Sequence, residues 1–185
     1  MIALPLAGFV VLALVGPRLS RRAVAWVGVG SVGLSFLAAL GVFATYAFGL
    51  PLAAPPASWS WLTTGGLNAN FSLHLDGLSL IFLLVVTGVG FLIHLYSTEY
   101  MAGEEGYSRF FAYMNLFVAS MLLLVLADNL LALLLGWEGV GLCSYLLIGF
   151  WYKDEGNGRA ARKAFVVTRL GDVALLLGIL LLFAN

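Results

Sequence analysis

The sequence predicts an all-α membrane protein with about six transmembrane helices and a short periplasmic β-hairpin between the second and third. Three observations support this fold class: 62% of the 185 residues are hydrophobic, only 10% are charged, and the mean hydropathy is +1.04. An ordinary soluble domain carries roughly 25% charged residues. Because so few charges cannot cover a water-soluble surface, lipid must solvate most of the chain.

Six apolar segments account for the predicted helices, since crossing a bilayer takes about 20 apolar residues. They are predicted over 2–16, 23–49, 76–97, 110–127, 130–151 and 164–184, and the first is short for a span. Asp128 and Asn129 form a tight polar break between the fourth and fifth segments. These two helices are therefore predicted to be antiparallel neighbours. The chain divides into 1–50, 51–75, 76–127 and 128–185, which hold helices 1–2, the outer connection, helices 3–4 and helices 5–6.

The outer connection, 51–75, has the pattern of a hairpin. Apolar and polar residues alternate on both sides of Gly65 and Gly66, which is typical of two short strands joined by a turn. Trp59 and Trp61 suit the headgroup zone of a membrane. Asp76 follows the connection and is predicted to cap the third helix, because aspartate is a favoured N-cap.

The basic residues predict the orientation of the helices. The odd-numbered connections hold eight of the nine Lys and Arg residues, whereas the connections 50–75 and 128–129 hold none. An excess of Lys and Arg marks cytoplasmic loops. Both termini are therefore predicted on the outer, periplasmic side, and the basic connections in the cytoplasm. The eight residues are Arg18, Arg21, Arg22, Arg109, Lys153, Arg159, Arg162 and Lys163.

Composition also excludes several functions. Nine basic and nine acidic residues give a formal net charge of zero, so no net field favours nucleic acid. The single cysteine, Cys143, excludes an internal disulfide bond. No Cys/His cluster has the spacing of a zinc or iron–sulfur site, so no metal or cofactor is predicted to bind this chain.

Glu138 is a carboxylate predicted close to the middle of the membrane. It is the ninth residue of the fifth helix, roughly 13 Å from the outer end. A charge there costs about 2.5–3.5 kcal/mol and usually faces a partner or a wet cavity. Gly136, Gly139 and Gly141 surround it and allow another helix to approach closely. Glu138 therefore either takes up and releases a proton or belongs to a static buried ion pair.

Arg169 and Asp172 are the other charges predicted inside the membrane. They lie three residues apart on the sixth helix and so share one face. The two side chains can pair with each other, which offsets much of the cost of burying them. The pair is either structural or a switch, since separation of Asp172 from Arg169 would change the field at a nearby buried acid.

Several motifs carry a family resemblance. They are DGLS at 76–79, VTGVGFLIH at 86–94, SRFFAYMNLF at 108–117, GWEGVGLCSYLLIGFWY at 136–152, ARKAF at 161–165 and RLGD at 169–172. Their order, spacing and helix placement resemble the N-terminal part of the L-subunit family of NADH–quinone oxidoreductase (respiratory complex I), which is an antiporter-like, proton-translocating family. The close match covers about residues 70–185.

The resemblance implies a function for particular residues. The essential glutamate of the family falls on Glu138, and its sixth-helix arginine and aspartate fall on Arg169 and Asp172. NADH, FMN, iron–sulfur clusters and quinone would bind partner subunits, and this chain would contact other membrane subunits and the lipid bilayer. Family members are several times longer, and their proton route also uses lysines and histidines on later helices. Because the carboxylate lacks its usual lysine partner, this chain alone is expected not to pump protons. The alternative is an A-type subunit of a multisubunit cation/proton antiporter or a membrane-bound hydrogenase.

Overall fold

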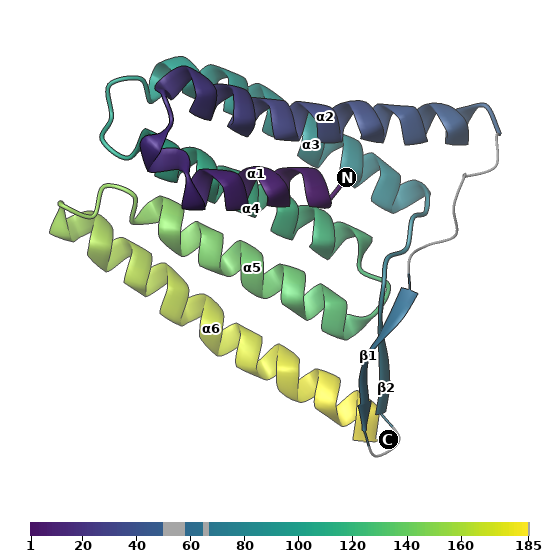
Figure 1. Cartoon of the computed structure of the whole chain (residues 1–185). Coiled ribbons are helices and arrows are strands. Elements are labelled where there is room, and N and C mark those ends of the chain that lie inside the picture. The colour runs from purple at the N-terminus through teal and green to yellow at the C-terminus, as the bar shows by residue number, and fades with distance from the viewer. Residues whose placement is uncertain (50–57, 65–66, 185) are drawn as a thin grey trace.

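A computed structural model describes residues 1–49, 58–64 and 67–184 as a bundle of α-helices with one β-hairpin (Figure 1). Within these residues, α2 to α6 are each long and apolar enough to cross a membrane, whereas α1 has 12 residues. The elements are α1 (Ala3–Leu14), a 3₁₀ turn (Gly16–Arg18), α2 (Arg21–Ala47), β1 (Ser58–Thr64), β2 (Leu67–Ser72), α3 (Gly77–Tyr100), α4 (Tyr107–Leu126), α5 (Leu130–Ile148) and α6 (Glu155–Ala184).

The predominance of helices and the two-stranded hairpin are confirmed, but the predicted start of the sixth helix is wrong. Helix α6 begins at Glu155, so Arg159, Arg162 and Lys163 lie on the helix and not in a loop. Hydropathy marks where lipid surrounds a helix and not where the helix starts. The Asp154 carboxylate accepts a hydrogen bond from the backbone N–H of Gly156 at 2.7 Å, and the following Ala, Arg and Lys residues favour helix.

Helix α4 lies at the centre of the bundle. It packs against α1, α2, α3 and α5, and α6 packs on the far side of α5 (Figure 1). The antiparallel contact between α4 and α5 confirms the prediction from Asp128 and Asn129. One buried cluster, around Phe111 and Leu12, joins α1, α2 and α4 near the basic end. A second cluster, around Leu83 and Leu122, joins α2, α3 and α4 toward the hairpin.

Side-chain caps begin three of the helices. Asp76 caps α3 as predicted, because its carboxylate accepts a hydrogen bond from the backbone N–H of Ser79 at 2.7 Å. In return, the Ser79 hydroxyl oxygen accepts from the backbone N–H of Asp76 at 2.8 Å. Asn129 caps α5 and Ser20 caps α2 by accepting a single backbone N–H bond each, from Ala132 and Ala23. Helix α4 begins after Gly106, whose φ of 82° is a conformation that favours glycine.

The hairpin is tied to the turn between α4 and α5. The Ser72 hydroxyl donates to Asp128 at 2.7 Å, and the Asn129 amide donates to the carbonyl of Asn70 at 2.6 Å. On the strands, Trp59 stacks on Phe71 with ring centroids 4.9 Å apart. Asp128 and Asn129 therefore form the turn between α4 and α5 and also bind the hairpin through hydrogen bonds. The predicted turn at 65–66 lies outside the described residues.

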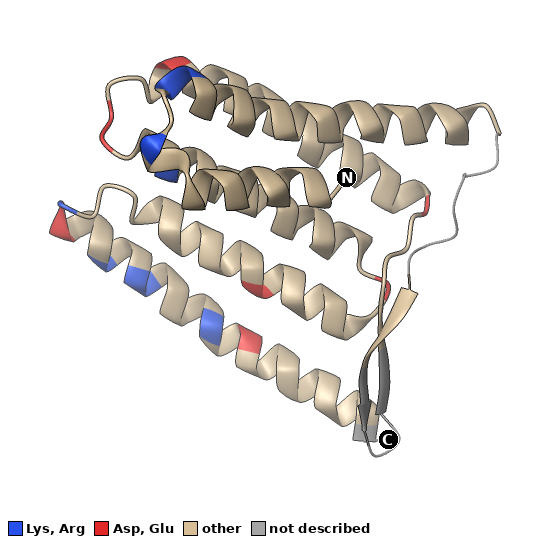
Figure 2. Cartoon of the chain, in the orientation of Figure 1, with Lys and Arg blue, Asp and Glu red and all other residues tan. Residues whose placement is uncertain are grey.

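Most of the basic residues lie toward the end of the bundle away from the hairpin, and the rest continue along α6 (Figure 2). At that end, Lys153 pairs with Glu105 at 2.6 Å, and the indole N–H of Trp151 donates to Glu104 at 3.0 Å. The Arg109 guanidinium lies between the rings of Phe150 and Tyr152, 5.1 and 5.0 Å from their centroids. These contacts, which we call the loop clamp, join the α3–α4 connection and the first turn of α4 to the α5–α6 connection.

The loop clamp is expected to depend on pH at both extremes. The hydrogen bond from Lys153 lowers the pKa of Glu105 from its ordinary 4.5, and the same contact raises the pKa of Lys153 from its ordinary 10.5. The contribution of Glu105 is therefore lost as the pH falls through its lowered pKa, and that of Lys153 as the pH rises through its raised pKa. Amide hydrogen exchange in 101–106, after correction for intrinsic rates, should be slowest between about pH 5 and 10. A Lys153→Gln variant should lose this dependence; an unchanged profile would contradict the clamp.

Candidate functional site

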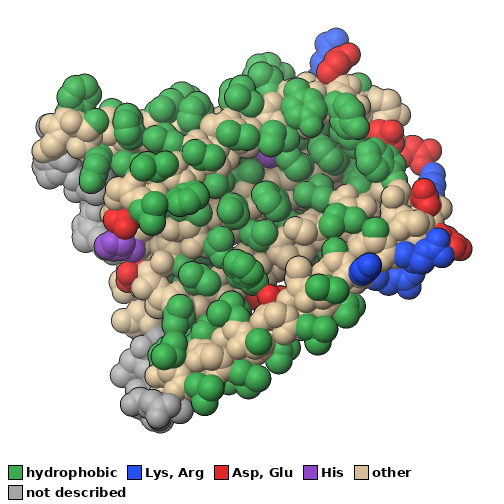
Figure 3. Space-filling view, turned by 180° about the vertical axis from the view of Figure 1, so that it is seen from behind, with side chains coloured by type: hydrophobic (Ala, Val, Ile, Leu, Met, Phe, Trp, Pro, Cys, Tyr) green, Lys and Arg blue, Asp and Glu red, His purple; other side chains and the backbone are tan. Residues whose placement is uncertain are grey.

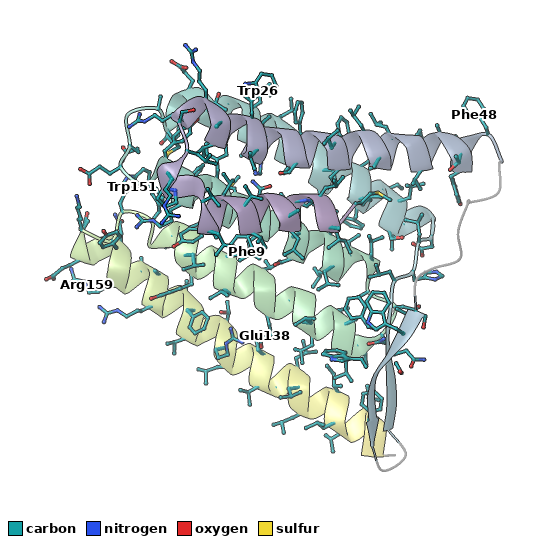
Figure 4. All side chains as sticks on the ribbon, viewed as in Figure 1. Phe9, Trp26, Phe48, Glu138, Trp151 and Arg159 are labelled. Atoms are coloured by element: carbon teal, nitrogen blue, oxygen red, sulfur yellow. The ribbon has the colours of Figure 1, made fainter. Side chains whose placement is uncertain are left out.

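Gly136 and Gly139 lie on the face of α5 that packs closely against α4. A Cβ at Gly136 would lie 2.6 Å from the backbone nitrogen of Leu124, and a Cβ at Gly139 would lie 2.6 Å from the hydroxyl oxygen of Ser120. The predicted close approach of a neighbouring helix is therefore confirmed at these two positions. Gly141 differs, because a Cβ there would meet nothing within 4 Å. Glu138 leaves α5 on the side of α6 (Figure 4).

Glu138, Arg169 and Asp172 come together between α5 and α6. The Arg169 guanidinium forms an ion pair with Glu138, and its Nη1 lies 3.7 Å from Oδ2 of Asp172. The side chains of Glu138 and Arg169 are 32% and 35% exposed, whereas that of Asp172 is only 7% exposed. The structure thus brings all three predicted site residues into one cluster. The pairing of Arg169 with Glu138 was not predicted, because sequence spacing relates residues only within one helix.

Two aromatic residues complete the cluster, and the sequence analysis did not identify either of them. The indole N–H of Trp137 donates to Oδ1 of Asp172 at 2.7 Å. The Arg169 guanidinium lies over the ring of Phe165, 4.6 Å from its centroid, at a distance typical of a cation–π contact. Only their positions in the sequence could have indicated them, since Trp137 directly precedes Glu138 and Phe165 lies one helical turn before Arg169.

The charge balance of the cluster determines what it can do chemically. With both carboxylates ionised, one guanidinium faces two negative charges. Charges in the middle of a membrane are tolerated where they pair or face a wet cavity. A proton or a further cation would neutralise the excess negative charge. The cluster is therefore able to bind a proton on a carboxylate. The carboxylate that lies closer to the Arg169 guanidinium is the one whose ionised form is stabilised more.

Two other polar residues, Asn115 and His94, are fully buried in the bundle. Asn115 joins α4 to α2, because its amide oxygen accepts from the Ser31 hydroxyl at 2.5 Å. Its nitrogen donates to the carbonyl of Phe111 within α4 at 2.9 Å. His94 is fully buried, with Nδ1 2.7 Å from the carbonyl oxygen of Gly90. Within the described residues, no group of three or more His, Cys, Asp or Glu is placed to hold a metal ion.

The outer surface of the bundle fits a membrane. Seen from behind, hydrophobic side chains cover most of the face (Figure 3). All the basic and several acidic side chains in this view gather at one edge, a few acidic ones lie at the opposite edge, and some acidic atoms lie among hydrophobic side chains in between. Five apolar helices and a charged cluster between two of them define a class, the multi-pass helical membrane proteins with intramembrane ion pairs.

Comparisons with known proteins specify the family. A model described as "NADH-Ubiquinone oxidoreductase (complex I), chain 5 N-terminus" matches residues 61–111, and "NADH:quinone oxidoreductase/Mrp antiporter, TM" matches 127–185. NADH-quinone oxidoreductase subunit L of Escherichia coli is 61% identical over 184 residues, which is 98% of this chain and 30% of that protein. Subunit L of Pseudomonas aeruginosa is 56% identical over 186 residues, 97% of this chain and 29% of that protein.

Solved structures show the same fold. A chain of the Mrp complex from Dietzia sp. matches with a TM-score of 0.71 and 31% identity over 95% of this chain and 18% of that one. A chain of respiratory complex I from Thermus thermophilus with bound aureothin matches with a TM-score of 0.72 and 21% identity, over 99% and 36% of the two chains. The chain belongs to the subunit L family of NADH-quinone oxidoreductases. It spans about 30% of the length of the curated relatives that it matches.

Proposed function

We propose that this chain belongs to the membrane-embedded, proton-translocating subunit L of an NADH-quinone oxidoreductase, and that Glu138 is the residue that takes up and releases the proton. The observation that carries the proposal is the cluster of Glu138, Arg169 and Asp172 between α5 and α6. The 61% identity to a protein named as this subunit supports the assignment. Oxidation of NADH and reduction of quinone take place on partner subunits, which hold FMN and the iron–sulfur clusters.

The shared guanidinium supplies a physical basis for proton exchange. While Arg169 pairs with Glu138, the ionised carboxylate is stabilised and the proton is released. When Arg169 moves toward Asp172, Glu138 loses its positive partner in a poorly solvated site, and binding a proton becomes favourable. Asp172 and Arg169 thus modulate the proton affinity of Glu138. Since the chain spans about 30% of its relatives, this activity is proposed for the complex assembled with the other membrane subunits.

The similarity to the Mrp complex supports one alternative, an A-type subunit of a cation/proton antiporter. Sealed inverted vesicles that contain the assembled complex distinguish the two. NADH should acidify the vesicle lumen, and an inhibitor of quinone reduction should stop the acidification. If instead a sodium pulse dissipates an imposed pH gradient and NADH has no effect, the antiporter function replaces the proposed one.

We also propose that the basic end of the bundle is cytoplasmic and that the hairpin and both termini are periplasmic, in a bacterial inner membrane. Cysteines introduced at Arg18 and Lys153 should react with a membrane-impermeant maleimide in inverted vesicles and not in sealed cells that expose the periplasmic face. The native Cys143 is buried and serves as the background control. Labelling of either position from the periplasmic side would contradict this orientation.

A further inference from the structure

Asp172 uses its two carboxylate oxygens for different partners. Oδ1 accepts the indole N–H of Trp137 at 2.7 Å, and Oδ2 lies 3.7 Å from Nη1 of Arg169. The indole contact has the shorter distance, although Arg169 lies on the same helix as Asp172. The carboxylate is therefore held by α5 at one oxygen while the other faces the guanidinium without a close hydrogen bond.

Trp137 and Asp172 also separate two clefts. A cleft of about 470 Å³ lies between α5 and α6, and a cleft of about 240 Å³ lies among α4, α5 and α6. Trp137, Thr168 and Asp172 line both of them. The Thr168 hydroxyl contacts the carbonyl oxygens of Ala164 and Phe165, at 3.1 and 3.0 Å, within its own helix. Among the three residues that line both clefts, the hydrogen bond from Trp137 to Asp172 is thus the contact that connects α5 to α6.

The hydrogen bond from Trp137 to Asp172 satisfies an indole N–H that lies in the membrane. An indole N–H in hydrocarbon needs an acceptor, because an unpaired polar group there is costly. Trp137 is 48% exposed, so burial of its ring alone does not explain its position. Asp172 supplies the acceptor, and the hydrogen bond in turn limits how far the carboxylate can move toward Arg169.

We propose that Trp137 is a positioning residue whose indole N–H holds the Asp172 carboxylate away from Arg169. The Arg169 guanidinium then pairs with Glu138. The same hydrogen bond keeps the two clefts separate. Release of the bond lets Asp172 take Arg169 from Glu138 and joins the clefts beside the charged cluster. Trp137 thereby sets how Arg169 divides between the two carboxylates. The effect on proton transfer rests on the proposed function, whereas the contact itself does not.

The first test replaces Trp137 with phenylalanine in the assembled complex. Phenylalanine keeps an aromatic ring and removes the N–H. A hydrogen bond to a charged group shifts an equilibrium by roughly tenfold or more, so NADH-driven proton translocation should fall by about that factor. Trp151→Phe is the matched control, because it also removes an indole N–H bonded to a carboxylate, but in the loop clamp. Translocation should be unchanged in this control. A Trp137→Phe complex that translocates at the wild-type rate would overturn the proposal.

The second test separates positioning from general packing. On an Asp172→Ala background, Trp137→Phe should have no further effect, because the acceptor is already gone; additive losses would overturn the proposal. The indole ¹H–¹⁵N resonance of Trp137, measured in the complex that retains Trp137, should also shift in Asp172→Ala. An unmoved resonance would contradict the contact even if Trp137→Phe fails to assemble. If the resonance shifts but Glu138→Gln translocates protons normally, the proposed function fails and the contact remains.

Discussion

Replacement of Glu138 by glutamine is expected to lower NADH-driven proton translocation by roughly tenfold or more. Glutamine has almost the same shape, but it neither binds nor releases a proton near neutral pH. It also leaves Arg169 with Asp172 as its remaining charged partner among the contacts of the cluster. The initial rate of lumen acidification in sealed inverted vesicles measures the effect.

The matched control for this variant is Glu99→Gln. Glu99 is an exposed carboxylate near the end of α3, so the substitution makes the same change of charge outside the cluster. Acidification should be unchanged in the control. Equal losses in the two variants would mean that the charge of the chain matters and the position of Glu138 does not.

Replacement of Gly136 by alanine is expected to cause a large loss of stability. The added Cβ would lie 2.6 Å from the nitrogen and 2.7 Å from the Cα of Leu124, and backbone atoms in a packed helix have little room to move. Overpacking of this kind costs about 1–3 kcal/mol. Thermal unfolding of the purified complex should therefore begin at a lower temperature, and less complex should accumulate in the membrane.

Gly141→Ala provides the control on the same helix. A Cβ there would meet nothing within 4 Å, and alanine favours helix over glycine by roughly 1 kcal/mol. This variant should be as stable as the wild type or more stable. If both alanine variants are equally unstable, backbone flexibility near Glu138 matters more than the close approach of α4 and α5.

Much of the fold was predictable because the bilayer imposes a single length scale. Each end of α2, α3, α4 and α5 lies within three residues of its predicted place. The start of α6 was not predictable in the same way, since 155–163 is a polar helical segment that apolar length does not detect. Its signals were local ones, an acceptor at Asp154 and helix-favouring residues after it.

The members of the candidate site were predictable, but their pairing was not. A charge inside an apolar span is visible in any sequence, and this identified Glu138, Arg169 and Asp172. Which charges meet depends on how α5 and α6 rotate and slide against each other, and no spacing within one helix encodes that. Trp137 was missed for the same reason. Its function in the cluster follows from a contact with a residue 35 positions away.

A rate of acidification alone does not show that Glu138 carries protons, because a slower oxidation of NADH would also slow acidification. The most direct measurement is the number of protons translocated per NADH oxidised, in vesicles containing the Glu138→Gln complex and in wild-type vesicles brought to the same rate of NADH oxidation with an inhibitor. If Glu138 carries protons, the ratio of protons to NADH should be lower in the variant. An unchanged ratio of protons to NADH would contradict this function of Glu138.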